Sequence, residues 1–149
     1  MNLKQIRTHF FFFLAKFPMK GQIRRKLVQW GGVRFADNHG FVGENCIFDT
    51  MYPEHIHIGR GVHITAGVTI LTHYLNTDID GISWRKGDVY IGDHSFIGTG
   101  TIITKDVRIG DNCIVGAGSV ITKDIPDNEI WAGNPAHFIK KKPMINMVE

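Results

Sequence analysis

The sequence is poor in cysteine, in excess charge and in long apolar runs, and each shortage excludes a class of protein. Its 149 residues include two cysteines, Cys46 and Cys113, too few for a disulfide framework and typical of reduced packing residues in a cytoplasmic protein. The net charge of +3 is too small to indicate a nucleic-acid-binding protein. The apolar run from Phe10 to Leu14 is far shorter than the roughly twenty residues of a membrane span. At 149 residues, one domain is expected.

What the sequence does contain is a six-residue period between Ile91 and Pro126. Two segments, IGDHSFIGTGTIITKDVR and IGDNCIVGAGSVITKDIP, align with each other, and branched residues recur at every sixth position within them. This period fits neither an isolated helix nor an alternating strand, and it predicts short β segments that turn a corner and repeat, three to a coil. Glycine and Asp-Asn positions suit the corners. The branched residues expected to stack in the core are Ile91, Ile97, Ile103, Ile109, Val115 and Ile121.

These repeats, together with the segments VGAGSVITKDIPDN and AGNPAHFIK, resemble the hexapeptide-repeat acyltransferases, in particular the galactoside, maltose and nodulation-factor O-acetyltransferases. The resemblance covers about residues 41–142 and implies an all-β fold, a left-handed parallel β-helix. The left hand comes from the resemblance, because the general rule for parallel crossovers predicts the opposite. We expect a helical N-terminal cap at 1–40, the β-helix at 41–133 with an extended loop at about 74–89, and a C-terminal tail at 134–149.

The first forty residues do not repeat, and we expect two short helices there, around Pro18 and Gly21. In the second, Ile23, Leu27 and Trp30 share one face at helical spacing. The first expectation is that this segment caps the open end of the solenoid, which would otherwise expose apolar surface. The alternative is a basic amphipathic anchor that associates peripherally with a membrane where glycolipids are built.

Position distinguishes His73 from the other histidines of the chain. The hexads stop directly after it, and the segment from Tyr74 to Val89 has no repeat before the period resumes. A long loop inside a compact solenoid is usually functional. Acyl transfer to a hydroxyl needs a base, and neutral imidazole suits that task near neutral pH. In the resembling acetyltransferases a histidine just before an extended loop is the catalytic base, and the resemblance gives this role to His73.

The resemblance also implies a homotrimer that binds acetyl-coenzyme A in a groove between subunits, with the saccharide acceptor between the catalytic histidine and earlier coils of a neighbour. Asp49 stands where the family often has an amide or acid that contacts the acceptor, and Tyr74, Asn76 and Trp84 in the loop could stack on or hydrogen-bond to a sugar. No metal is expected, because no second histidine follows His73 at ligand spacing. The positions that match cofactor contacts are Phe96, Gly98, Thr99, Ala117, Thr122 and Lys123, and Lys140 could meet a coenzyme phosphate.

The sequence therefore predicts a cytoplasmic acetyltransferase that moves an acetyl group from acetyl-coenzyme A to a hydroxyl of a saccharide, in a cell-surface polysaccharide or its precursor. His73 would deprotonate the acceptor for direct attack on the thioester, since no serine or cysteine nucleophile is paired with a base. Two alternatives stay open. One is an N-acetyltransferase acting on an amino sugar, and the other is a non-catalytic β-helix subunit of an assembly.

Overall fold

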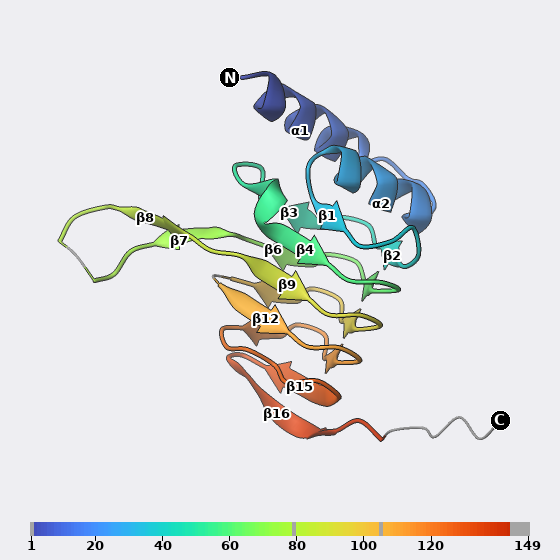
Figure 1. The fold of residues 1–149 in the computed structure, drawn as a ribbon, viewed down its shortest axis with the longest axis vertical. Helices are drawn as coiled ribbons and strands as arrows, with labels where there is room; N and C mark the ends of the chain where they lie inside the picture. Colours follow the sequence, from blue (N-terminus) through green and yellow to red (C-terminus); the bar gives the residue numbers. More distant parts are fainter. Residues whose placement is uncertain (1, 79, 105, 144–149) are drawn as a thin grey trace.

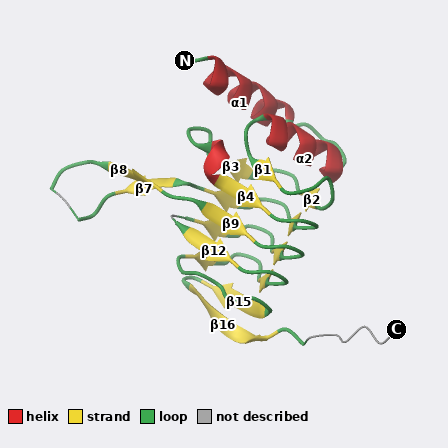
Figure 2. Ribbon diagram, in the orientation of Figure 1, coloured by secondary structure: helices red, strands yellow, loops and turns green. Residues whose placement is uncertain are grey.

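The main body of the protein is a coil of short parallel strands (Figure 1). A computed structural model describes residues 2–78, 80–104 and 106–143. Each strand of the coil pairs with the strand one turn away, so that the strands form three sheets, one on each side of the coil. Two helices cover one end, and a two-stranded ribbon projects from the side (Figure 2). The architecture is a parallel β-helix with a helical end.

The three sheets are named here A, B and C in the order in which the chain visits them. Sheet A contains β1 (Arg34–Phe35), β4 (Ile56–Ile58), β9 (Val89–Ile91) and β12 (Val107–Ile109). Sheet B contains β2 (Phe41–Val42), β5 (His63–Ile64), β10 (Phe96–Ile97), β13 (Ile114–Val115), β15 (Glu129–Gly133) and β16 (Ala136–Lys141). Sheet C contains β3 (Ile47–Phe48), β6 (Thr69–Ile70), β11 (Ile102–Ile103) and β14 (Val120–Ile121).

The residues of the six-residue period form the core, as predicted. In sheet C, Ile103 pairs in register with Ile70 on one side and Ile121 on the other. In sheet A, Ile58 pairs with Ile91. All five are at most 3% exposed, so each coil stacks its branched side chains on those of the next. Removal of this apolar surface from water is the main term that stabilises the fold.

Two of the three corners are tight and need left-handed backbone. At the corner from sheet A to sheet B, His94 and Asn112 have φ values of 56°. At the corner from sheet B to sheet C, Asn45 has φ 55° and Gly100 has φ 70°. Asparagine and glycine are the residues that adopt this region at least cost, which explains their recurrence at the repeat's corners. At the third corner, from sheet C to sheet A, the described residues between β3 and β4 have no positive φ, whereas the longer insertion between β6 and β9 has Gly81 at φ 86°. This corner accepts insertions of different length.

Helices α1 (Leu3–Leu14) and α2 (Gly21–Trp30) cover the end of the coil that begins with β1 (Figure 1). The helix α1 begins with a capping box in which Asn2 and Gln5 bond each other's backbone amides. The apolar face of α2 packs inward only in part, because Leu27 lies against the core whereas Ile23 and Trp30 are 51% and 55% exposed. Arg24 and Arg25 are buried instead, and backbone carbonyls accept hydrogen bonds from both guanidinium groups. Within the described residues, neither helix has the length and apolar character needed to cross a membrane.

Two segments expected to be irregular are strands. The ribbon consists of β7 (His73–Leu75) and β8 (Trp84–Lys86), which pair antiparallel inside the segment predicted as a loop. The predicted tail contains β16, which pairs antiparallel with β15 and extends sheet B. Each of these two antiparallel pairs joins strands that follow each other in the chain, not strands of successive coils. The six-residue period therefore does not predict them. Residue 79 of the loop and residues 144–149 of the tail lie outside the described residues.

Candidate active site

Both irregular segments of the coil lie at the same corner, the one from sheet C to sheet A. After β3 the chain makes a 3₁₀ turn, η1 (Pro53–His55), before it enters β4. After β6, one coil later, it forms the β7–β8 ribbon before it enters β9. The same corner is short in the next two coils, between β11 and β12 and beyond β14. Polar residues that are far apart in the sequence therefore meet at this corner.

The central contact at this corner joins His73 to Asp49. The imidazole Nδ1 lies 2.6 Å from Asp49 Oδ2. The Asp49 side chain is 0% exposed, whereas the His73 side chain is 27% exposed. An ionised carboxylate can only accept hydrogen bonds, so the proton of the neutral ring belongs on Nδ1 and the free electron pair on Nε2. The pair thus holds the imidazole in the tautomer that can accept a proton through Nε2.

The surrounding backbone holds Asp49 in its ionised form. Oδ2 also accepts hydrogen bonds from the Thr72 amide at 2.9 Å and the Thr72 hydroxyl at 2.8 Å, and Oδ1 accepts one from the Met51 amide at 2.8 Å. Burial alone would raise the pKa of the Asp49 carboxyl, but hydrogen bonds from the Thr72 amide, His73 and the Thr72 hydroxyl outweigh it and hold the pKa below the ordinary 3.8. Asp49 was expected to contact the acceptor. Its carboxylate instead faces inward, fully buried against His73.

Two aromatic rings lie beside the His73 imidazole. The Tyr52 ring lies 6.4 Å from it and the Trp84 ring 5.6 Å, both edge-to-face by centroid distance and tilt. The Lys86 ammonium lies 5.4 Å from the centroid of the Tyr52 ring. Trp84 is 64% exposed, so its indole offers an accessible apolar surface beside the histidine. Sequence reasoning missed Tyr52, although it follows Asp49 where the repeat slips by a few residues, and that slip was the available signal.

The other predicted acceptor residues lie farther along the ribbon. Tyr74 pairs with Arg85 across the two strands. Asn76 accepts a hydrogen bond from the Asp78 amide at its Oδ1, at a distance of 3.2 Å, and so shapes the chain beyond β7. Of the three ribbon residues proposed from the sequence, Trp84 is the one in ring contact with His73.

A second histidine cluster lies next to this corner. Asp88 Oδ1 is 3.0 Å from His55 Nδ1 and 2.9 Å from His57 Nε2. The pKa of the Asp88 carboxyl is lowered from its ordinary value, chiefly by the hydrogen bond with His57. Burial opposes this lowering with a smaller effect, and the hydrogen bond with His55 adds to it. Both histidines are about one quarter exposed and hydrogen-bonded. Among the described residues, no group of three or more His, Cys, Asp or Glu side chains could hold a metal ion.

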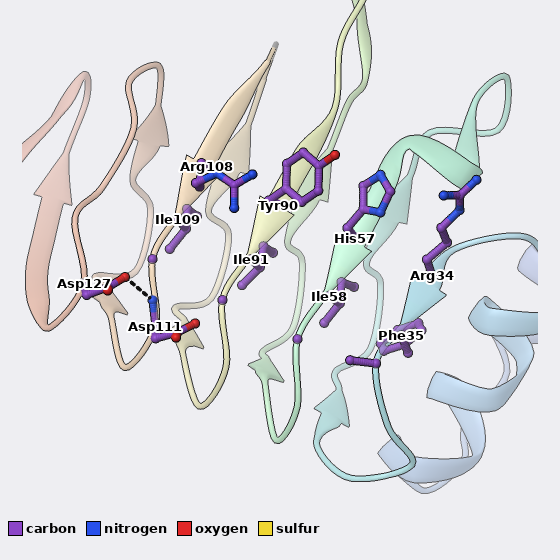
Figure 3. Close-up of a pocket in the computed structure, with 14 residues that line it drawn as sticks. Arg34, Phe35, His57, Ile58, Tyr90, Ile91, Arg108, Ile109, Asp111 and Asp127 are labelled. Atoms are coloured by element: carbon purple, nitrogen blue, oxygen red, sulfur yellow. Dashed lines mark hydrogen bonds between the residues drawn. The ribbon is translucent and has the colours of Figure 1, made fainter.

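The outer face of sheet A carries a row of stacked side chains. The rings of His57 and Tyr90 are 4.4 Å apart and nearly parallel, and the Arg108 guanidinium lies 4.4 Å from the Tyr90 ring. Figure 3 shows these three side chains and Arg34 in a row across neighbouring strands, beside a groove of about 430 Å³. Contacts of this kind between neighbouring strands stabilise the sheet.

The predicted cofactor residues do not form one surface with His73 in a single chain. Thr122 and Lys123 lie at the same corner as His73, beyond β14, whereas Thr99 and Ala117 lie at the corner from sheet B to sheet C. The side chain of Phe96 is 43% exposed on sheet B, and Lys140 lies on β16 in the same sheet. At Gly98 a Cβ would come within 2.5 Å of the Ala117 nitrogen. The close packing of successive coils therefore already requires glycine there.

Comparisons with known proteins agree with this architecture. A family model described as bacterial transferase hexapeptide (six repeats) matches residues 88–123. A maltose O-acetyltransferase from Clostridium difficile 630 has a similar structure, with a TM-score of 0.70, 29% identity and coverage of 94% of this chain and 87% of that one. A galactoside acetyltransferase in complex with coenzyme A has a TM-score of 0.69, 25% identity and coverage of 94% and 81%.

A third solved structure shares the fold at lower identity. It is a hexapeptide-repeat-containing acetyltransferase from Vibrio cholerae O1 biovar eltor complexed with acetyl coenzyme A, with a TM-score of 0.78, 20% identity and coverage of 94% of this chain and 87% of that one. No curated protein matches the sequence. These findings confirm the predicted resemblance and the predicted fold class, a left-handed parallel β-helix.

Proposed function

We propose that this chain, a hexapeptide-repeat protein of the left-handed β-helix class, is an acetyltransferase that moves the acetyl group of acetyl-coenzyme A to a saccharide hydroxyl. The observation that carries the proposal is the hydrogen bond of 2.6 Å between His73 and the buried Asp49 at the corner where the repeat is interrupted. Similarity to the maltose and galactoside enzymes supports acetyl-coenzyme A as the co-substrate. A non-catalytic assembly subunit would have no use for a partly exposed histidine held by a buried carboxylate.

In the proposed reaction, His73 Nε2 takes the proton of the acceptor hydroxyl while the oxygen attacks the thioester carbonyl carbon. The ionised Asp49 stabilises the imidazolium that forms, as a carboxylate does in hydrolytic triads. The tetrahedral intermediate then collapses, the carbon–sulfur bond breaks, and the imidazolium returns its proton to the departing thiolate. The products are an acetyl ester and the free thiol of coenzyme A. His73 begins and ends the cycle neutral.

The Asp49–His73 pair favours a hydroxyl acceptor over an amine. An alcohol is a weak nucleophile until a base removes its proton during attack, and the Asp49 carboxylate holds the imidazole in the orientation and tautomer for that task. A neutral amine attacks a thioester without prior loss of a proton. The proposed acceptor is therefore a hydroxyl, and an amino sugar is the alternative that a side-by-side assay separates.

The surface around His73 suits a saccharide. Sugar rings pack on exposed aromatic faces, and Trp84 provides such a face beside the imidazole. Tyr52 also lies beside His73, and the Lys86 ammonium next to the Tyr52 ring could bond a sugar oxygen. Tyr74 and Asn76 remain proposed contacts farther along the ribbon. A cell-surface polysaccharide or its precursor is the proposed acceptor by analogy alone.

We also propose that the active form is a homotrimer. In one chain, His73 and the cofactor candidates Thr99 and Ala117 occupy different corners of the coil. A neighbouring copy that presented its own corner from sheet B to sheet C would complete the site between subunits.

The two cysteines are free thiols, in keeping with the proposed cytoplasmic location.

Titration calorimetry with acetyl-coenzyme A tests the proposed function directly. We expect one equivalent of ligand to bind per chain, on a sample whose mass in solution corresponds to a trimer. Coenzyme A without the acetyl group should bind to the same site and compete. A folded protein that shows no binding up to about millimolar ligand would overturn the proposal, because such an affinity is weaker than about −4 kcal/mol.

Replacing Asp49 with asparagine tests the role of the carboxylate separately. The amide keeps the shape but cannot hold the proton of His73 on Nδ1 in the same way, so we expect kcat to fall at least about 100-fold with KM for the acceptor changed little. The matched control is Thr72→Val, which removes a neighbouring hydrogen bond to the same carboxylate and should have a smaller effect. Equal losses in both variants, or a change in KM alone, would contradict a positioning role for Asp49. The measurement is steady-state release of the coenzyme thiol.

A further inference from the structure

The helix α1 has two apolar faces, and one of them packs on the rest of the protein. On the inward face, the Thr8 hydroxyl donates a hydrogen bond of 2.7 Å to the Gly31 carbonyl, and Thr8 is 1% exposed. The Phe12 ring on the same side lies 6.0 Å from the Phe48 ring of the first coil. These contacts fix the orientation of α1, because successive residues of a helix are rotated by about 100°.

The opposite face of α1 is apolar and uncovered. Residues separated alternately by three and four positions along α1 share one side of a helix. Here they form what we call the outer stripe, which continues past the end of α1 to Phe17, whose ring lies 5.4 Å from that of Phe13. A contiguous patch of several exposed apolar side chains on one element marks an interaction surface. The members of the outer stripe and their exposed fractions are Leu3 86%, Ile6 47%, Phe10 55%, Phe13 58% and Phe17 51%.

The apolar surface extends sideways from the stripe. On one side, the Phe11 ring contacts Trp30 of α2 at 5.6 Å, and Trp30 is 55% exposed. On the other side, Phe13 also lines a groove of about 470 Å³ between α1 and the first coil, together with Phe12 and Phe48. Figure 1 shows α1 at the extreme end of the molecule, so no other segment of the described chain shields this surface.

The two helices at this end of the molecule carry basic residues and no acidic ones. The net charge of +3 conceals an asymmetry, because residues 1–36 contain eight of the 17 lysines and arginines and none of the 14 acidic residues. Arg24 and Arg25 are buried, and Lys4 pairs with Glu54. The remaining basic residues on and between the helices are exposed, and Lys16 lines the same groove as Phe13. These basic residues are Arg7, Lys16, Lys20 and Lys26.

We propose that the outer stripe docks on the surface of a membrane that contains anionic lipids, with α1 lying in the plane of the interface. An apolar helix face flanked by basic residues inserts among the acyl chains while its cations meet anionic headgroups. Pairing of the stripes of two copies of this chain is disfavoured, because it would bring two sets of basic residues together. In a homotrimer the stripe of one copy would instead meet a different surface of its neighbour, and the oligomeric mass of the stripe variants tests that outcome. This proposal concerns α1 and does not rest on acetyl transfer.

Co-sedimentation with lipid vesicles tests the proposal on the full-length protein. We expect binding to vesicles of phosphatidylcholine mixed with phosphatidylglycerol, and much weaker binding to phosphatidylcholine alone. The double variant Phe10→Ser/Phe13→Ser should lower the partition coefficient at least about tenfold, because it removes two inserted rings. Lys16→Glu/Lys20→Glu should lower it by a similar factor and weaken its dependence on salt. The matched control is Phe138→Ser, which changes a phenylalanine that is 47% exposed on β16, away from the helices.

Three results would overturn the proposal. The first is that the wild type does not sediment with anionic vesicles at low salt. The second is that both double variants bind like the wild type. The third is that Phe10→Ser/Phe13→Ser changes the oligomeric mass while the wild type fails to bind vesicles, which would assign the stripe to contact between copies. Thermal melting followed by circular dichroism checks that each variant is folded. If the phenylalanine variant does not fold, the lysine variant still tests the proposal, because its substituted side chains are exposed.

Discussion

Replacing His73 with alanine should lower turnover by about 10²- to 10⁴-fold, the range that a positioned general base contributes. His73 is partly exposed, whereas its partner Asp49 is buried, so the change removes the group that would face the substrate. The fold should survive, because the branched residues of the neighbouring strands form the core without it. The measurement is release of the coenzyme thiol in the presence of a saccharide that the wild type acetylates.

The design of this experiment separates catalysis from binding. His73→Ala should retain its affinity for acetyl-coenzyme A in calorimetry, since loss of a base affects the chemical step. The matched control is His39→Ala. His39 is an exposed histidine that bonds the nearby Asp37, and it precedes β2 rather than belonging to the β7–β8 ribbon. A His73→Ala enzyme with the wild-type rate would remove His73 from its proposed role. Loss of acetyl-coenzyme A binding together with activity would instead indicate a structural role.

Replacing Ile103 with aspartate should abolish the folded coil. Ile103 is 0% exposed and lies in register between Ile70 and Ile121 in sheet C. A carboxylate there is buried without a partner, and an uncompensated buried charge costs at least about 3–5 kcal/mol. That loss is comparable to the whole stability of many domains, about 5–15 kcal/mol. The free energy of unfolding, measured by urea titration followed by circular dichroism, should therefore fall by most of its wild-type value.

A conservative change at the same position provides the control. Ile103→Val removes one methylene and should cost about 0.5–1.5 kcal/mol, with a cooperative transition retained. If Ile103→Asp unfolded cooperatively at a urea concentration close to that of the wild type, the side chain would have to reach solvent. The stacked core inferred from the six-residue period would then be wrong at this coil.

Much of the fold was predictable because its repeat is local. The six-residue period alone identified the buried residues of sheets A, B and C, since each side of the coil repeats the same alternation of core residue and corner. The period also located the irregular corner, because the hexads stop after His73 and slip after Asp49. The two helices at the N-terminal end were expected around Pro18 and Gly21, and α1 ends before Pro18 while α2 begins at Gly21.

The tertiary structure alone decided which side chains meet across the coils. Asp49 and His73 are 24 residues apart and come together because one corner stacks on the other, with insertions of different length between them. Stacking of that kind depends on loop conformation, which a six-residue period does not determine. The sequence therefore predicted that Asp49 contacts the acceptor and did not predict its contact with His73. The inward face of α2 and the uncovered stripe of α1 were decided in the same way, by contacts with the first coil. A repeat determines its own core because every turn imposes the same local geometry, whereas the site arises where that geometry is interrupted.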